Sequence, residues 1–298
     1  MFENIFDLSL LKELSDWRIV TYILLGGTLL TVFKILNGLL AGYRLNQELT
    51  EKDNKAIAVS LAGFILSLCL IIHGVLVSPG EWYYTDTNNS IWLADLKNTC
   101  LWATLGCAYL LIARIINDKL ILPQFSNKDE LVRDQNVGVG IVQAASYIST
   151  ALVIKATISS PETLSLGEEL ILTTIWFFCT QALLIIFAKL YQLLTKYDMH
   201  VELRNDNVAV GVAFGGNMIA FSILLSFFIS TYDSLAGLII WATISCILLW
   251  IIRIIVDKLL LPNHTLDTEI SLDRNWGAGI IEAVTAIGVA LIISGSFL

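Results

Sequence analysis

Charged residues are scarce in this chain. Asp, Glu, Lys and Arg make up 15% of its 298 residues, whereas hydrophobic residues make up 56% and the mean hydropathy is +0.74. About a quarter of the residues in an ordinary soluble domain are charged. The deficit predicts a surface that faces lipid, and it excludes a soluble enzyme and a secreted domain held by disulfides. The net charge of −8 also disfavours nucleic acid as a partner.

Residues that hold metals or carry redox chemistry are also few. The chain has three histidines, and its five cysteines form no CxxC pair. It contains no HExxH sequence, no Ser/His/Asp set is apparent, and the Gly-x-Gly pairs at 138–140 and 277–279 lack the third glycine of a dinucleotide-binding loop. We therefore expect no metal, no cofactor and no enzymatic activity.

Long apolar runs are what the sequence does contain. A helix needs about 20 mostly apolar residues to cross about 30 Å of hydrocarbon. The sequence predicts an all-α integral membrane protein with eight transmembrane helices in the lipid bilayer. Residues 1–17 predict a short amphipathic helix at the membrane interface, with a disordered tail as the alternative. The spans are expected at 18–43, 55–78, 98–117, 136–158, 168–195, 207–230, 235–256 and 275–297.

The basic residues predict the orientation of these spans. Of the 18 Lys and Arg residues, 13 lie in the loops that follow the odd-numbered spans, and 4 lie in the termini and the other loops. Because cytoplasmic loops are enriched in Lys and Arg, both termini are expected outside. Most of the negative charge then lies on the outer side. That charge either attracts cations to an outer mouth or simply reflects acidic segments that cross the membrane easily.

The chain contains a tandem repeat. Shifted by 139 residues, WATLGCAYLLIARIINDKLILP at 102–123 aligns without gaps with WATISCILLWIIRIIVDKLLLP at 241–262. We therefore divide the chain into a first four-span repeat, residues 18–160, and a second, residues 161–298. Four spans are an even number, so the two repeats are expected to be parallel, related by an axis along the membrane normal.

A shorter repeat lies inside this one and suggests that the ancestral unit was a helical hairpin. Each even-numbered span begins with an asparagine that is suited to cap the helix: Asn54, Asn136, Asn207 and Asn275. Small residues follow four and eight positions later, a spacing that allows helices to pack closely in lipid. These pairs are Ala58 and Ala62, Gly140 and Ala144, Gly211 and Gly215, and Gly279 and Ala283. Alternatively, the four helix N-termini form an anion-attracting ring.

Two segments of the chain carry a resemblance to a known family: DNVAVGVAFGGNMIAFSILLS at 206–226 and NWGAGIIEAVTAIGVAL at 275–291. In these segments the sequence resembles the YjfL-like bacterial membrane proteins, the family of domain of unknown function 350. The resemblance covers essentially residues 18–298, as two copies of the family's unit. The family brings no established activity and no catalytic residues. The resemblance implies a multi-pass protein of the bacterial cytoplasmic (inner) membrane.

Four polar residues are expected at similar depth within the spans. Glu282, its first-repeat counterpart Gln143, Lys34 and Asn217 lie roughly 10–15 Å from the cytoplasmic helix ends, at 1.5 Å per residue. Ionisable residues inside a membrane are candidates for function. We hypothesise that Glu282 and Lys34 pair across the interface between the repeats, near Asn217. The alternative is that Lys34 extends to the membrane surface and that Glu282 is protonated between helices.

Two functions remain open at this stage. Parallel repeats, a negative outer face and buried charges favour a conduit or transporter for a small cation or solute. The similar loops at 117–135 and 256–274 favour instead a membrane scaffold or stress-response partner that binds a cytoplasmic protein.

Overall fold

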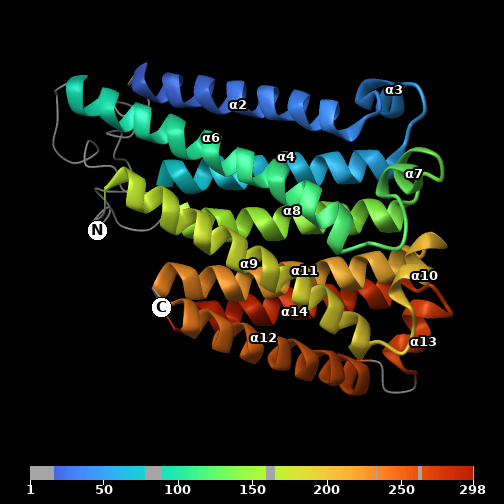
Figure 1. Ribbon diagram of the computed structural model, residues 1–298. Coiled ribbons are helices and arrows are strands. Elements are labelled where there is room, and N and C mark those ends of the chain that lie inside the picture. The colour runs from blue at the N-terminus through green and yellow to red at the C-terminus, as the bar shows by residue number, and fades with distance from the viewer. Residues whose placement is uncertain (1–16, 78–88, 159–164, 233, 261–263, 298) are drawn as a thin grey trace, which may run out of the picture.

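The computed structural model describes residues 17–297 apart from 78–88, 159–164, 233 and 261–263 (Figure 1). Every regular element in the described part of the chain is a helix, and eight helices are long and apolar enough to cross a membrane. The prediction of an all-α protein with eight transmembrane helices is thus confirmed. The predicted amphipathic segment 1–17 lies almost wholly outside the described residues.

The long helices form four pairs, each with a short helix between its members. The elements are α2 (Trp17–Ala41), α3 (Leu45–Thr50) and α4 (Lys55–Val77); α6 (Asn89–Leu120), α7 (Asn127–Val132) and α8 (Val137–Ile158); α9 (Leu166–Leu194), α10 (Met199–Arg204) and α11 (Val208–Thr231); and α12 (Leu235–Ile255), the π-helical turn η2 (Val256–Leu260), α13 (Leu266–Ser271) and α14 (Trp276–Ser296). The four short helices lie at one end of the molecule, and the C-terminal end of α14 lies at the other (Figure 1).

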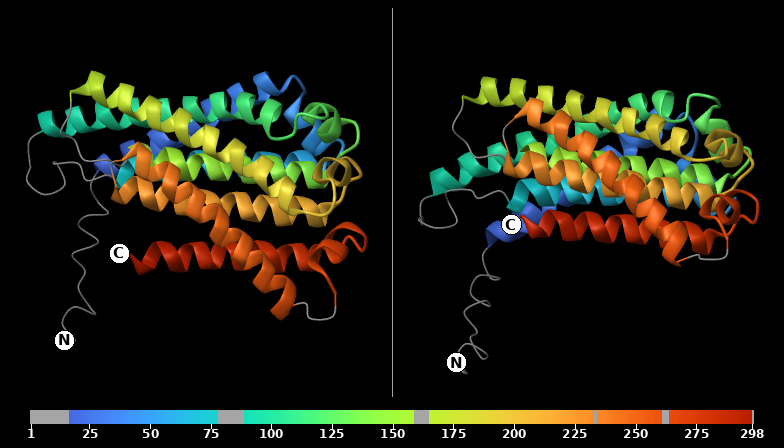
Figure 2. Two further views of the ribbon diagram at one scale, coloured as in Figure 1. Left: turned by 60° about the horizontal axis from the view of Figure 1, so that its bottom comes forward. Right: turned by 90° about the horizontal axis from the view of Figure 1, so that it is seen from below.

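The second long helix of each pair belongs to an inner row, α4–α8–α11–α14, and the first belongs to an outer row, α2, α6, α9 and α12. Neighbours in the inner row make the most extensive helix contacts of the structure. The two middle helices are the most enclosed, with 78% of the apolar stretch buried in α8 and in α11 but only 11% in α2. Figure 2 shows the rows from two further directions.

Small residues allow this close approach. A Cβ atom built on Gly140 would lie 2.5 Å from the carbonyl oxygen of Ala56, and one on Gly211 would lie 2.6 Å from that of Gly138. Such distances leave no room for a side chain. The inner helices therefore pack backbone against backbone, as small residues permit in lipid.

The turn before each inner helix has the same conformation. The residue that precedes the capping asparagine is Asp53, Gln135, Asp206 or Arg274, and all four have positive φ angles between 49° and 56°. The short helices before these turns were not predicted from the sequence. Three of them have a capping residue that could have indicated their start, because the side chains of Ser126, Asp198 and Thr265 each accept a hydrogen bond from the first turn of the helix that follows.

Helix α6 begins at Asn89, nine residues before the predicted start of the third span. Hydropathy locates the part of a helix that lies in hydrocarbon, whereas α6 continues through the polar residues Asp95 and Lys97. The Tyr22 hydroxyl on α2 donates a hydrogen bond of 2.6 Å to Asp95 at this level. At 32 residues the helix is about 48 Å long and exceeds the apolar thickness of a bilayer.

A candidate ion-binding cluster between the inner and outer rows

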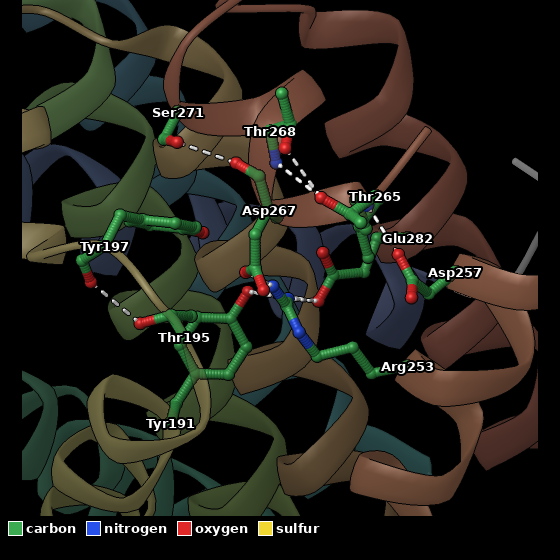
Figure 3. Close-up of polar contacts among 12 residues, drawn as sticks. Tyr191, Thr195, Tyr197, Arg253, Asp257, Thr265, Asp267, Thr268, Ser271 and Glu282 are labelled. Atoms are coloured by element: carbon green, nitrogen blue, oxygen red, sulfur yellow. Dashed lines mark hydrogen bonds and ion pairs between the residues drawn. The ribbon is translucent and has the colours of Figure 1, made fainter. Parts of the chain in front are cut away.

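The candidate site is a cluster of buried polar side chains in the second half of the chain (Figure 3). It joins Arg253 on α12, Glu282 on α14, Tyr191 on α9 and Asn217 on α11 with Asp267 on the short helix α13. Glu282 is 1% exposed and Arg253 is 7% exposed. Five helices therefore contribute to one polar centre inside an otherwise apolar molecule.

Arg253 lies between two carboxylates. Its Nη1 atom is 2.5 Å from Oε1 of Glu282, and its Nη2 atom is 2.7 Å from Oδ1 of Asp267. The Tyr191 hydroxyl accepts a hydrogen bond of 3.0 Å from Arg253 and donates one of 3.0 Å to Oε1 of Glu282. The Asn217 amide donates to the same oxygen at 2.9 Å. Oε1 of Glu282 thus has three partners.

The other oxygen of Glu282 has none. Oε2 is buried and makes no hydrogen bond with any described residue. With all three ionised, Arg253, Glu282 and Asp267 carry a net charge of −1. A buried carboxylate oxygen without a partner, in a cluster with excess negative charge, is unfavourable unless a positive charge neutralises it.

Tyr197 lies near the cluster. Burial raises the pKa of its phenol above the ordinary value, so this phenol is neutral.

The cluster reaches from the end of the molecule that carries the short helices into the membrane interior. The Asp267 side chain is 18% exposed on α13. Glu282 lies seven residues beyond the helix cap, about 10 Å deep, and Asn217 lies ten beyond its own cap, about 15 Å deep. A cavity of about 20 Å³, room for about one water molecule, is lined by residues that include Asn217 and Arg253. Phe187 also lines this cavity, and its ring stacks on that of Phe221 with the ring centroids 4.4 Å apart.

The first half of the chain has a version of the site without the buried glutamate, in which Arg114 forms an ion pair of 3.7 Å with Asp118. Arg114, the counterpart of Arg253, donates to the backbone and side-chain oxygens of Asn37. Asn37 occupies the position of Tyr191 at the 154-residue shift. Gln143 occupies the position of Glu282, accepts from Ser60 and donates to Asp118 at 2.8 Å. The two halves also differ in two side chains at this site, because the first half has Phe64 where the second has Asn217, and Lys128 where the second has Asp267. The first half also continues as an α-helix where the second has the π-helical turn η2.

The hypothesis that Glu282 pairs with Lys34 is wrong in this structure. Glu282 is paired with Arg253, and Lys34 is exposed on α2. Helix α2 packs mainly against α4 and α6, at the opposite edge of the molecule from α14 (Figure 1). The expectation failed because Arg253, near the end of the span predicted at 235–256, was counted among the basic residues of the cytoplasmic loop that follows. Asn217 does contact Glu282, whereas Gln143 lies in the first-half cluster.

The four capping asparagines link neighbouring hairpins. Their Oδ1 atoms accept from the first turns of α4, α8, α11 and α14. Their amides donate to a glutamate of the preceding short helix, which is Glu48, Glu130, Glu202 or Glu269. Three amides also reach the next short helix: Asn54 donates to the Leu131 carbonyl, Asn136 to that of Leu203, and Asn207 to that of Ile270. These are structural contacts, and no anion ring is needed to explain them.

The small residues divide into two groups. Gly140, Ala144, Gly211, Gly215, Gly279 and Ala283 lie in contacts between inner helices. Ala58 and Ala62, on the far side of α4, are exposed. In the described part of the chain, no three His, Cys, Asp or Glu side chains are grouped so as to hold a metal ion.

The sequence analysis missed Arg253, Tyr191 and Asp267. Arg253 was hidden because the repeat matches it to Arg114, so both seemed to be ordinary span-exit residues. A signal was available in the positions at which the repeats differ in charge. Lys128 becomes Asp267 and Gln143 becomes Glu282, so the second half gains acid on both sides of an arginine that is present in each half.

Comparison with known proteins gives the family. The Domain of Unknown Function (DUF350) matches twice, at residues 9–158 and 165–297. A UPF0719 transmembrane protein of Aquifex aeolicus is 24% identical over 255 residues, which cover 84% of this chain and 88% of that protein. The UPF0719 transmembrane protein YshE of Bacillus subtilis is 28% identical over 111 residues, 37% of this chain and 81% of that protein. No solved structure matches. The chain belongs to the DUF350 family, as a multi-pass transmembrane protein with two tandem copies of the domain.

Proposed function

We propose that this protein transports a small monovalent cation, with a proton as the first candidate, and that Glu282 is the binding residue. One observation carries the proposal. With all three groups ionised, the cluster of Arg253, Glu282 and Asp267 has a net charge of −1, and it contains a buried carboxylate oxygen without a partner. Such a cluster is completed by one positive charge. A proton on Oε2 neutralises it without displacing any of the contacts to Oε1.

The position of the cluster gives it access from one side. Asp267 connects it to the end with the short helices, which the distribution of Lys and Arg predicts to be cytoplasmic. Toward the other end, the stacked rings of Phe187 and Phe221 and the apolar residues Leu224 and Leu225 are buried. The cluster therefore lies nearer the end with the short helices, and this supports entry of the cation from that side.

Loading of the site should change the contacts between two helices. A neutral Glu282 attracts the Arg253 guanidinium less strongly, while Asp267 still holds it at 2.7 Å. Because Arg253 lies on α12 and Glu282 on α14, proton binding weakens one connection between the outer and inner rows. A ligand that binds two conformations unequally shifts their populations, which is what transport requires of its substrate.

Flux measurements in liposomes test the proposal. Purified protein is reconstituted, and an imposed pH gradient without sodium is compared with a sodium gradient at constant pH. We expect proton flux that Glu282→Gln abolishes while the protein stays folded, and that Lys34→Met, which changes a charged residue outside the cluster, leaves unchanged. Sodium flux with the same dependence on Glu282 would assign sodium instead. Absence of both fluxes from folded protein would overturn transport and favour the scaffold function.

A further inference from the structure

The contact between α8 and α11 joins the two halves of the chain through polar groups. The Asp206 carboxylate, just before α11, accepts hydrogen bonds from the backbone N–H groups of Val137 (2.9 Å) and Gly138 (3.3 Å) at the start of α8. In the other direction, the Asn136 amide donates to the Leu203 carbonyl at 2.5 Å. The end of one repeat and the beginning of the next thus exchange hydrogen bonds at the ends of their helices.

Each half of this contact recurs at one end of the inner row, without a partner from a neighbouring hairpin. The dipeptide Asp53–Asn54 before α4 repeats Asp206–Asn207 before α11, with φ angles of 49° and 56° at the aspartates. Asp53 is exposed, and no described residue donates a hydrogen bond to its carboxylate.

At the other end, the Asn275 amide donates to Glu269, but it lacks the second acceptor that the other three caps have. Asn275 is also exposed, whereas the other three caps are 1% exposed or less.

We propose that the free face of α14 binds the free face of α4 of a second copy of this chain, through the contacts that α8 and α11 make within the chain. Asp53 of the second copy would then accept a hydrogen bond from the N–H group of Trp276, as Asp206 accepts from Val137 in α8, while the Gly277 N–H already donates to Oδ1 of Asn275. The Asn275 amide would donate to the Leu49 carbonyl, which occupies the position of Leu203 in the short helix of the second copy. This inference does not depend on ion binding at Glu282.

The side chains on the free faces of α4 and α14 allow these helices to pack together, but at a larger separation than α8 and α11. Ala58 on α4 takes the place of Gly211, and Gly277 on α14 takes the place of Gly138. One turn further, Ala62 faces Val284, which is 63% exposed. The extra methyl groups separate these helices more than the inner helices of one chain. The contact between chains should therefore be weaker than the contacts within the chain.

A second copy explains both ends better than an unrelated occupant. Apolar surface alone does not select a partner in lipid, so the specificity comes from the polar groups at the helix ends that lack a partner from a neighbouring hairpin. These groups match each other and already have a working example in the α8–α11 contact. The Bacillus subtilis relative matches 81% of its length to 37% of this chain, about one repeat. If such a single-repeat unit associates with itself, its duplication in one chain converts a contact between two chains into a contact within one chain, as between α8 and α11.

Cross-linking in liposomes tests the proposal. In a chain without its native cysteines, Ala58→Cys and Gly277→Cys are made as separate proteins. The equivalent Gly140 and Ala56 are close enough for a disulfide, because a Cβ on Gly140 would lie 3.1 Å from the Cα of Ala56. Head-to-tail association predicts a linked dimer in the oxidised mixture and none in either protein alone. The contact is heterologous, so it forms rings or open chains.

Two results would overturn the proposal: no linked dimer in the mixture, or efficient cross-linking of Gly277→Cys by itself, which would show a symmetric α14–α14 contact. Leu39→Cys, on exposed α2 near the same membrane level, replaces Ala58→Cys in a matched control and should give only background. Asp53→Ala should weaken association about tenfold or more, as expected for loss of a hydrogen bond to a charged group. An unchanged linked fraction in that variant would show that Asp53 caps no neighbouring helix.

Discussion

The Arg253 guanidinium and the Glu282 carboxylate lie 2.5 Å apart and join an outer helix to an inner one. The equivalent pair in the first half, Arg114 and Gln143, makes no such bond, because Arg114 binds the oxygens of Asn37 and Gln143 binds Ser60 and Asp118. The equivalent arginines of the two halves thus bind different groups, because Arg114 binds the oxygens of Asn37 and Arg253 binds the carboxylate of Glu282. This difference makes each half a control for the other.

The stability of the cluster should depend unequally on its members. Arg253→Met leaves the buried Glu282 and the partly exposed Asp267 without a counter-charge, and we expect it to lower the free energy of unfolding by about 3–5 kcal/mol. Glu282→Gln leaves Arg253 paired with Asp267 and should cost less. Unfolding in mixed micelles measures both. Arg114→Met leaves the oxygens of Asn37 without their donor and removes the ion pair with the partly exposed Asp118, and it should cost about 1–3 kcal/mol. Equal losses for Arg253→Met and Glu282→Gln would contradict this charge balance.

Lys34 should contribute little to stability. It is exposed on α2 and makes no ion pair with Glu282. We expect Lys34→Met to change the free energy of unfolding by less than about 0.5 kcal/mol, as at exposed positions in general. The double variant Lys34→Met, Glu282→Gln should equal the sum of the single changes, since distant sites are additive. Strong coupling between the two would restore the pairing hypothesis.

The inner-row glycines should not tolerate even a methyl group. A Cβ on Gly211 or Gly279 would lie 2.6 Å from a carbonyl oxygen of the neighbouring helix. We expect Gly211→Ala and Gly279→Ala each to destabilise the protein by about 1–3 kcal/mol through overpacking. Gly288→Ala is the control, because nothing lies within 4 Å of its Cβ position and alanine favours a helix. If all three variants melt alike, the close contacts do not form.

The capping asparagines should differ in importance. Asn136→Ala removes the cap of α8 and the bonds to Glu130 and Leu203, so it should exceed the usual loss of about 0.5–2 kcal/mol for a cap. Asn275→Ala removes fewer bonds within one chain. Its cost should grow with protein concentration in the bilayer if a second copy accepts from its amide. A dilution series followed by unfolding measures this dependence.

Topology is testable without purified protein. With both termini outside, a reporter that is active only outside should work when fused after Leu298 and should fail when inserted at Asn127. Asn127 begins α7, one of the short helices at the end that is expected to be cytoplasmic. The reverse pattern would place the Glu282 cluster on the outer side of the membrane.

Much of the fold was predictable because each span is a local property of hydropathy. The eight helices and the small residues between them follow from composition and from the repeat. The partner of Glu282 could not be predicted in this way. Membrane depth limits which residues can reach Glu282, but it does not give the rotation of each helix about its axis. Arg253 and Glu282 come together only through the packing of α12 against α14. Asp267 was invisible for another reason, since it lies on a short helix that span prediction treats as a loop.

The backbone contacts of the inner row have a mechanical consequence. Where the Gly138 carbonyl fills the space beside Gly211, α8 and α11 cannot slide along each other without collision. Piston-like motion is thereby disfavoured, and the middle of the row acts as a fixed frame. Large motions fall more readily to outer helices such as α12, in which only 28% of the apolar stretch is buried and which can tilt within the bilayer. The ion pair between Arg253 and Glu282 then connects the more mobile helix α12 to the fixed inner row at α14.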